Sequence, residues 1–388
     1  MTVQKTVTHS WGSRLGDSIK GVVVGLILFV VAFPVLWMNE GRSVKTYRAL
    51  KEGAGAVVHV ESSEINPEYE GKLIHITNKA DTSDVLTDGT FGISATAIKL
   101  ERKVEMFQWK ENSSTKKEKK VGGSEVETTT YTYEKGWEDH VIDSSGFQEE
   151  GHNNPTAMPY ESQELAAENV RCGAFRLSSE QIARIGGAVP LNPPAELELS
   201  IERCVKTATG FYISVDGNSS EAQPAIGDVR VKFTVVKPHD ISICAVQQGD
   251  TFVSYVAKNG KTVNLQTDGV KSADEMFTSA QNANKMLTWL LRIVGFAMMY
   301  IGIGMILKPL SVLGDVLPFV GNLIGMGASV VAFLVALPCS LVVIAIAWIV
   351  YRPVLGVILL VVVIGLIVAF RNLYAKVKAA KQPEQPAA

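Results

Sequence analysis

The fold is decided first by residues 21–38, which read GVVVGLILFVVAFPVLWM and contain no charged side chain. A helix rises about 1.5 Å per residue, so roughly 20 apolar residues cross the hydrocarbon core of a bilayer. The segment therefore predicts a first transmembrane helix. A cleaved signal peptide is the alternative, because Lys5, Arg14 and Lys20 precede the apolar run. The exit at 33–39 has no small-x-small cleavage site, which favours an uncleaved anchor.

Three further apolar segments lie near the end of the chain. Residues 286–307 carry Arg292 as their single charge, at a place where a long cation can reach the lipid headgroups. Residues 320–350 and 354–370 are free of charge and are separated by the turn 351–353. Four transmembrane helices are therefore predicted, which places both termini on one side of the membrane.

The lysine and arginine residues near the span ends predict which side carries the termini. They are slightly more numerous on the side of the termini, and positive residues accumulate in the cytoplasm. We therefore expect cytoplasmic termini and an extracytoplasmic domain. The expected order is a cytoplasmic segment 1–20, span 21–38, β-rich domain 39–285, span 286–307, cytoplasmic loop 308–319, span 320–350, turn 351–353, span 354–370 and a disordered cytoplasmic tail 371–388.

The domain inserted between the first and second spans reads mostly as strands, so the predicted fold class is an α+β membrane protein. Residues 229–235 alternate apolar and polar side chains, which is the period of a strand with one buried face. Similar shorter runs are predicted at 56–61, 72–77, 99–109, 125–134, 199–204, 210–215, 241–247 and 252–257. The runs 99–110 and 125–134 predict a long hairpin with the polar insert 111–124 as its solvated tip.

Helices are expected at three places in or beside this domain. Ser178 and Gln181 have the spacing of a capping box and predict a short helix. Another short helix is predicted at 160–169. Ser272 and Glu275 form a second capping-box pair, and no glycine or proline follows before the middle of the second span. A helix that begins there is therefore predicted to run unbroken into that span.

Cysteine spacing and net charge give no sign of a cofactor or of a nucleic-acid partner. Cys172, Cys204 and Cys244 lack CxxC spacing, so they are either free and buried or include one disulfide. The formal net charge is −2, which gives no reason to propose nucleic acid as a partner. The polar domain also contains no GxSxG, HExxH or GxGxxG motif.

One polar group could carry acid–base or metal chemistry. It consists of His140, Asp143, Glu149 and His152, which lack the fixed spacing of metal motifs and read as a solvated loop. A membrane-anchored, metal-dependent hydrolase is the corresponding alternative function. The spans contain no Asp, Glu or His, which argues against a pump and leaves a channel or channel modulator as a second alternative.

Small residues in the spans allow close approach of helices. Gly302 lies in the second predicted span, while Gly321 and Gly325 have GxxxG spacing in the third. Such residues pack helices within one chain or between chains. These three glycines are therefore candidates for self-association, with intrachain packing as the other interpretation.

Several segments carry a family resemblance. They are 36–42 (LWMNEGR), 104–109 (VEMFQW), 131–133 with Trp137, 151–158 (GHNNPTAM) with 161–162, 227–231 (GDVRV), 289–292 (WLLR) and 351–353 (YRP). In order and spacing the chain resembles the transmembrane protein 43 family, also called LUMA. The candidate site residues from these motifs are Asn39, Glu40, Gly41, Arg42, Glu105, Gln108, Trp109, His152, Asn154, Pro155, Gly227, Asp228, Arg230, Trp289, Arg292, Tyr351, Arg352 and Pro353.

The resemblance implies a four-span, non-enzymatic membrane scaffold that self-associates and organises other membrane proteins. In animals the family is placed in the endoplasmic reticulum and inner nuclear membrane, with emerin and lamins as partners. Those partners are not carried over, because the lysine-rich insert and short tail also fit a bacterial relative in the inner (cytoplasmic) membrane. The expected partners are the lipid bilayer, further copies of the chain and other membrane proteins of unknown identity; no cofactor is expected.

Overall fold

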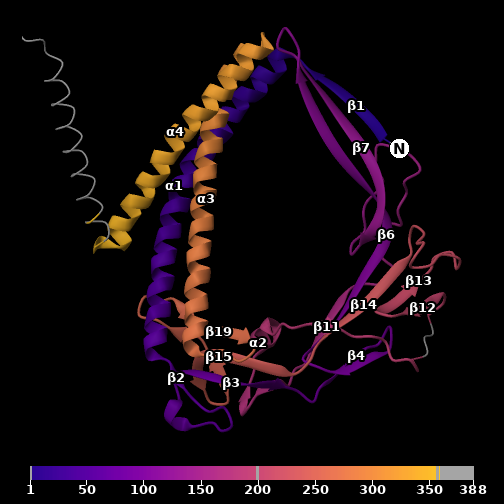
Figure 1. Cartoon of the computed structure of the whole chain (residues 1–388), viewed down its shortest axis with the longest axis vertical. Helices are drawn as coiled ribbons and strands as arrows, with labels where there is room; N and C mark the ends of the chain where they lie inside the picture. Colours follow the sequence, from indigo (N-terminus) through magenta and orange to yellow (C-terminus); the bar gives the residue numbers. More distant parts are fainter. Residues whose placement is uncertain (1, 198–200, 355–357, 359–388) are drawn as a thin grey trace, which may run out of the picture. The chain divides into compact units, whose positions relative to one another are not determined.

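The computed structural model describes residues 2–197, 201–354 and 358 (Figure 1). The chain forms two compact units, each described by itself below. The first, here the sheet unit, comprises Met1–Thr8, Ala49–Glu118 and Val126–Gln281. The second, here the helix unit, comprises His9–Arg48, Lys119–Glu125 and Asn282–Ala388.

Three long helices contain the first three predicted spans. They are α1 (Trp11–Ala56), α3 (Ala273–Gly314) and α4 (Pro318–Tyr351), and each is long and apolar enough to cross a membrane. Most of the predicted fourth span, 354–370, lies outside the described residues. The described chain is thus an α+β fold with a β-rich region between its first and second long helices. The number of crossings and the side of each segment stay predictions.

Helix α3 begins where its capping box predicts. The amide of Ser272 donates to Glu275 Oε2 at 2.8 Å, and the amide of Glu275 donates to Ser272 Oγ at 3.3 Å. These bonds satisfy amides that have no partner inside the helix. The helix continues without a break through the second predicted span, as predicted, and then on to Gly314, so residues 308–314 of the expected loop 308–319 are helical. The capping box of the short helix α2 (Ser179–Arg184) is confirmed as well.

The longer of the two main sheets has eight strands. Its neighbours run in the order β1 (Thr2–His9), β7 (Glu125–Glu138), β6 (Lys99–Lys119), β14 (Val229–Val236), β13 (Gly210–Ile213) and β12 (Cys204–Thr207), with β8 (Gln163–Ala166) beside β6 and β11 (Val189–Pro190) beside β14. The alternation of β14 is confirmed, because Val229, Val231, Phe233 and Val235 are all buried. Phe233 packs in this core with Phe91 and Phe211.

The second sheet has seven strands. They are β10 (Phe175–Arg176), β9 (Arg171–Cys172), β3 (Leu73–Asp81), β15 (His239–Gln248) and β16 (Thr251–Val253), with β19 (Leu265–Asp268) beside β15 and β2 (Val58–His59) beside β3. Two small hairpins, β4 (Val85–Asp88) with β5 (Ile93–Thr96) and β17 (Tyr255–Val256) with β18 (Thr262–Val263), and the short helix η1 (Pro67–Tyr69) complete the unit. Leu50 of α1 and Phe277 of α3 share a hydrophobic core with Leu73 of β3.

Two predictions about the sheet unit are wrong, and one cannot be judged in full. Residues 160–169 contain strand β8, not a helix, because Leu165 pairs with Leu100 of β6 and joins the hydrophobic core. The polar insert 111–124 is mostly strand: β6 continues to Lys119, where cross-strand contacts such as Lys117–Glu127 (2.8 Å) stabilise the pairing. Of the run 199–204, the described residues 201–203 form a turn before β12.

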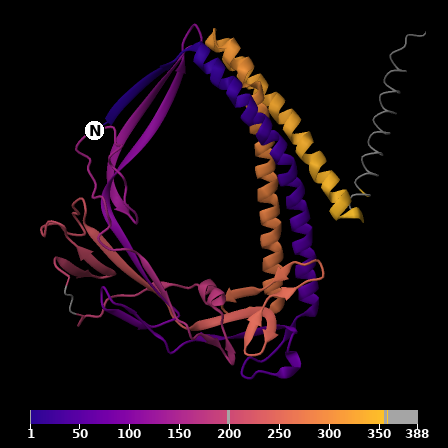
Figure 2. The ribbon, with the colours of Figure 1, turned by 180° about the vertical axis from the view of Figure 1, so that it is seen from behind.

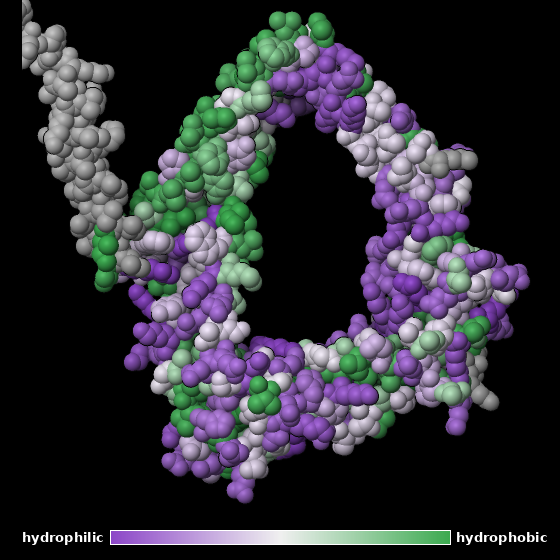
Figure 3. Space-filling model, in the orientation of Figure 1, coloured by the Kyte–Doolittle hydropathy of each residue, from purple (hydrophilic) through white to green (hydrophobic). Residues whose placement is uncertain are grey.

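The helix unit holds α1, α3 and α4 side by side (Figures 1 and 2). Their common core includes Ala32 and Leu36 of α1, Met299 of α3 and Ala336 of α4. Away from this core the helices present mostly hydrophobic side chains (Figure 3). Such a surface is compatible with lipid.

Candidate functional site

The motif residues of the helix unit meet around a buried carboxylate. Glu40 of α1 is 0% exposed and accepts two bonds from Arg292 of α3, from Nε to Oε1 at 2.6 Å and from Nη2 to Oε2 at 2.9 Å. Trp348 of α4 donates its indole N–H to Glu40 Oε2 at 2.7 Å. One carboxylate therefore ties all three helices together, and its bonds are the strong, charge-assisted kind.

Aromatic rings complete the environment of Arg292. Its guanidinium lies 4.8 Å from the ring centre of Trp289 and 5.4 Å from that of Trp348. A guanidinium over an indole face gains a favourable cation–π interaction. The ion pair Glu40–Arg292 is thus enclosed by side chains of the same chain.

A second set of polar side chains adjoins Glu40 on α1. Asn39 donates to the carbonyl of Thr288 at 3.0 Å, and Arg42 donates to Asn284 Oδ1 at 3.0 Å and to Asn39 Oδ1 at 3.1 Å. Thr288 also bonds to Ser43 Oγ at 2.8 Å. These bonds join α1 to α3, and together with the Glu40 contacts they define what we call the helix cluster.

The remaining motif residues of the helix unit place α4 against α1. A Cβ atom on Gly41 would lie only 2.7 Å from the Tyr351 ring, so the glycine makes room for the tyrosine. Trp37 also contacts Tyr351, with ring centres 5.7 Å apart. Arg352 lies over Trp348 at 5.9 Å, and Pro353 follows directly after this contact.

The three glycines proposed for self-association face neighbours within the chain. A Cβ atom on Gly302 would lie 2.6 Å from the carbonyl oxygen of Gly25, which shows how closely α3 approaches α1. A Cβ on Gly321 would collide with Asp315, and one on Gly325 would lie 3.1 Å from Ser311 Oγ. These contacts favour the intrachain interpretation, and association through these glycines stays a prediction.

Another buried carboxylate lies where α3 meets α4. Asp315 is 1% exposed and accepts bonds from Arg14 Nη2 at 2.5 Å and from Lys119 Nζ at 2.8 Å. Trp11 donates its indole N–H to the carbonyl of Val312 at 2.9 Å, and a Cβ atom on Gly123 would collide with the Trp11 ring. We call this group the end cluster, and no sequence motif predicted it.

The motif residues of the sheet unit form a different arrangement, here the sheet cluster. Arg230 of β14 lies directly opposite Glu105 of β6 and forms an ion pair with it. The guanidinium also lies 4.6 Å from the ring centre of Trp137. Burial tends to raise the pKa of Glu105, but the hydrogen bond and positive charge of Arg230, together with the charges of Lys103 and Lys232, lower it.

Asp228 connects the turn before β14 to the neighbouring strand. It is 0% exposed and accepts bonds from the hydroxyl of Tyr212, from the amide of Val215 at 2.8 Å and from the amide of Ala225 at 2.6 Å. Burial and the bond to Asp228 raise the pKa of Tyr212 to about 12. Gly227 has a φ of +94°, a conformation that favours glycine, and packs beside Pro155.

Gln108 and Asn154 hold a loop against β6. The Gln108 side chain donates to the carbonyl of His140 at 2.7 Å and accepts from the amide of Ile142 at 2.9 Å. Asn154 accepts from the amide of Trp109 at 2.7 Å and donates to its carbonyl at 2.9 Å, as a neighbouring strand would. Both side chains therefore act as backbone partners.

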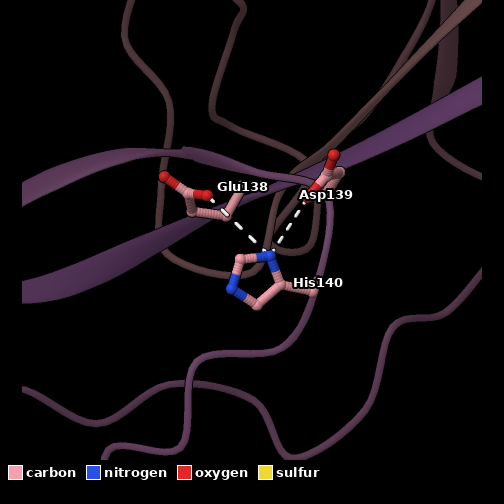
Figure 4. Close-up of side chains that lie close together, drawn as sticks. All are labelled: Glu138, Asp139 and His140. Carbon is pink, nitrogen blue, oxygen red and sulfur yellow. Dashed lines mark hydrogen bonds and ion pairs between the residues drawn. The ribbon is translucent and has the colours of Figure 1, made fainter. Parts of the chain in front are cut away.

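The four residues considered for acid–base chemistry, His140, Asp143, Glu149 and His152, do not form one metal-holding group among the described residues. The ring of His152 stacks on Tyr133 at 4.1 Å and meets Trp109 edge-on at 4.5 Å, while His140 bonds to Asp139 at 3.0 Å. Asp143 accepts from the amide of Ser145 at 2.9 Å. His140 therefore lies with Glu138 and Asp139 instead (Figure 4), a largely exposed group whose ligand atoms are close enough to hold a metal ion.

The cysteines of the described chain are all free. Burial raises the pKa of the Cys172 and Cys244 thiols to about 12 and that of Cys204 to about 11. Thiols of such high pKa are weak nucleophiles. The structure therefore agrees with the interpretation of free, mostly buried cysteines and not with a disulfide.

Comparison with known proteins identifies one family. Residues 106–353 match the model of the family described as transmembrane protein 43. The chain is 35% identical over 352 residues to transmembrane protein 43 of Rattus norvegicus and 34% identical to that of Homo sapiens, covering 88% of this chain and 86% of each relative. It is 30% identical to the Drosophila melanogaster homolog, covering 87% of this chain and 90% of that relative. No solved structure matches.

Proposed function

Because the chain belongs to the transmembrane protein 43 family, we propose that it is a non-enzymatic scaffold that self-associates in the membrane and organises other membrane proteins. This family is one of membrane proteins and not a known enzyme family. The three long apolar helices support contact with the lipid bilayer.

The exposed face of α4 is the observation that carries the proposal. Large apolar side chains recur on it every three or four residues, and each is between 46% and 79% exposed: Phe319, Leu323, Met326, Val330 and Phe333. This spacing places them on one side of the helix. A continuous apolar surface of this kind is stable only against lipid or another protein.

The motif clusters support a structural role for the same residues. Glu40, Asp228 and Glu105 each bind partners from other segments of the chain, as an assembly framework requires. His152 serves as an aromatic surface for Tyr133 and Trp109. These contacts support a role of the motif residues in stabilising the fold.

Cross-linking in the native membrane tests self-association through α4. Val330→Cys, on the exposed face, should give disulfide-linked dimers on mild oxidation, because equivalent positions meet in a symmetric contact. The control is Val24→Cys on α1, which is similarly exposed but lies outside the proposed surface. Equal cross-linking of both variants would argue for random collisions.

Native mass spectrometry and proximity labelling test the scaffold as a whole. Oligomers in gentle detergent and a reproducible set of neighbouring membrane proteins are expected. Monomers alone, with no membrane protein neighbours, would contradict the proposal. Conductance in reconstituted bilayers would favour the channel alternative, and stoichiometric bound metal would favour the hydrolase.

A further inference from the structure

Two histidine rings of the sheet unit meet where the chain leaves the first long helix. His59 of β2 follows shortly after the end of α1 at Ala56, and it lies opposite His75 in the parallel pairing of β2 with β3. The two Nδ1 atoms are 2.9 Å apart, and the ring centres are 5.1 Å apart. His59 is exposed, whereas His75 is only 4% exposed.

The buried ring also contacts the segment that enters α3. Nε2 of His75 lies 2.8 Å from the carbonyl oxygen of Lys271, which directly precedes Ser272, the capping residue of α3. The amide of Lys271 donates to Ser242 Oγ of β15 at 2.9 Å. His75 and Ser242 therefore bind both backbone groups of Lys271. Within the sheet unit, His75 thus connects the chain that leaves α1 to the chain that enters α3.

These contacts determine where the protons of the pair lie. A carbonyl oxygen only accepts hydrogen bonds, so Nε2 of His75 carries a hydrogen. A neutral imidazole has one N–H, so Nδ1 of His75 is an acceptor and Nδ1 of His59 donates to it. His59 can gain a further proton at Nε2 without disturbing this bond. A proton on Nδ1 of His75 would instead place two N–H groups against each other, and the bond would be lost.

Burial opposes this protonation of His75. Desolvation lowers the pKa of His75 below its ordinary value of 6.5, and a charge on His59 lowers it further. The bond to the Lys271 carbonyl raises the pKa but only partly compensates. The folded state therefore binds fewer protons at this ring than the unfolded state. The resulting stabilisation is complete above pH 6.5 and is lost as the pH falls through the lowered pKa.

The surroundings supply no counter-ion for a charged His75. The other ionisable groups on the elements around it are Lys51 and Glu52 of α1, Glu61 after β2, Asp240 and Cys244 of β15, and Lys271, Asp274 and Glu275 at the start of α3. Among the described residues, His59 is the group whose charge acts on the pKa of His75. Cys244 lies directly opposite His75, and burial raises the pKa of its thiol to about 12, so it is uncharged.

We infer that the His59–His75 pair is an acid-sensitive latch that holds the segment following α1 against β3. While His75 is neutral, the latch is closed. In mildly acidic surroundings His75 also takes up a proton, the bond between the two Nδ1 atoms breaks, and two adjacent imidazolium rings repel each other. Strand β2 is only two residues long, so little else holds it in the sheet. The contact of His75 with Lys271 survives, because Nε2 still donates.

Hydrogen–deuterium exchange of the full chain in detergent tests the latch. The amide of Val60 donates to the carbonyl of His75 at 3.0 Å and reports on the attachment of β2. It should exchange about five- to tenfold faster at pH 5 than at pH 7, after correction for the chemical exchange rate, as for the loss of one hydrogen bond. The amide of Lys271 should keep its protection. Unchanged protection of Val60, or an equal increase at Lys271, would overturn the inference.

His59→Asn identifies the titrating pair without altering a buried residue. Its side-chain amide can donate to neutral His75 and, turned over, accept from protonated His75, so the attachment should no longer depend on pH. The matched control is His239→Asn, which removes a histidine of the same unit that bonds to Asp268. This control should keep the five- to tenfold change at Val60. A change that persisted in His59→Asn would show that another group is responsible and would overturn the inference.

Discussion

The helix cluster and the sheet cluster both contain a carboxylate–arginine pair, but they bury it to different degrees. The side chains of Glu40 and Arg292 are 0% and 13% exposed, while those of Glu105 and Arg230 are 14% and 23% exposed. In a site that excludes water, a charge whose partner is removed is stabilised neither by solvent nor by another side chain. Near the surface, water and dissolved ions screen an unpaired charge, so removing its partner costs less. The helix cluster should therefore be the more sensitive of the two to substitution.

Glu40→Ala should have the largest effect. The change leaves Arg292 buried without its counter-ion and removes the acceptor of Trp348, so the free energy of unfolding should fall by about 3–5 kcal/mol. Thermal unfolding of the purified protein in detergent measures the loss. The double variant Glu40→Leu with Arg292→Leu removes both charges and should recover most of the stability. An unchanged unfolding temperature in Glu40→Ala would break the comparison.

Asp228→Ala should have the next largest effect, because this carboxylate of the sheet cluster is as buried as Glu40. Its removal leaves the amides of Val215 and Ala225 without an acceptor, so a loss of about 3 kcal/mol is expected. Tyr212→Phe, which removes one hydrogen bond to the same carboxylate, should cost only about 1 kcal/mol. Equal losses in the two variants would show that the backbone bonds are unimportant.

Local patterns predicted the elements from which these clusters are built. The alternation of β14 placed Arg230 on the polar face of its strand, and the charge-free runs located the three long helices. Contacts between distant residues had no local signal. Trp348 is 308 positions from Glu40, and Lys119 is 196 positions from Asp315. The end cluster was missed for this reason; the one local signal that could have indicated it is that Asp315 is an acid between two apolar segments.

The prediction for residues 160–169 failed for a related physical reason. Helix propensity is a weak preference that tertiary contacts override. The backbone of Gln163–Ala166 pairs with β6, and Leu165 thereby reaches the core. The hairpin insert was mistaken for a loop because its strands are polar on both faces, which removes the alternation by which a half-buried strand is recognised.

A fall in pH should weaken the Glu105–Arg230 pair. The pKa of Glu105 is lowered in the folded protein from its ordinary value of 4.5, so the folded state holds fewer protons than the unfolded state. The stabilisation is present above pH 4.5 and is lost as the pH falls through the lowered pKa. Because the pair is partly exposed, we expect about 1 kcal/mol or less. Glu105→Gln should remove this part of the pH dependence, seen as a smaller difference between unfolding at pH 7 and at pH 3.

Substitution of His152 should have the smallest effect and distinguishes packing from chemistry. His152→Ala removes the stacking on Tyr133 and the edge contact with Trp109, worth about 1 kcal/mol. Nδ1 of His152 is buried without a hydrogen-bond partner, so His152→Phe keeps the ring contacts and loses no bond at that atom. Thermal unfolding should therefore rank the phenylalanine variant with the wild type or above it. A stable His152→Phe protein that lost its oligomeric state or its membrane neighbours would show instead that the imidazole takes part in function.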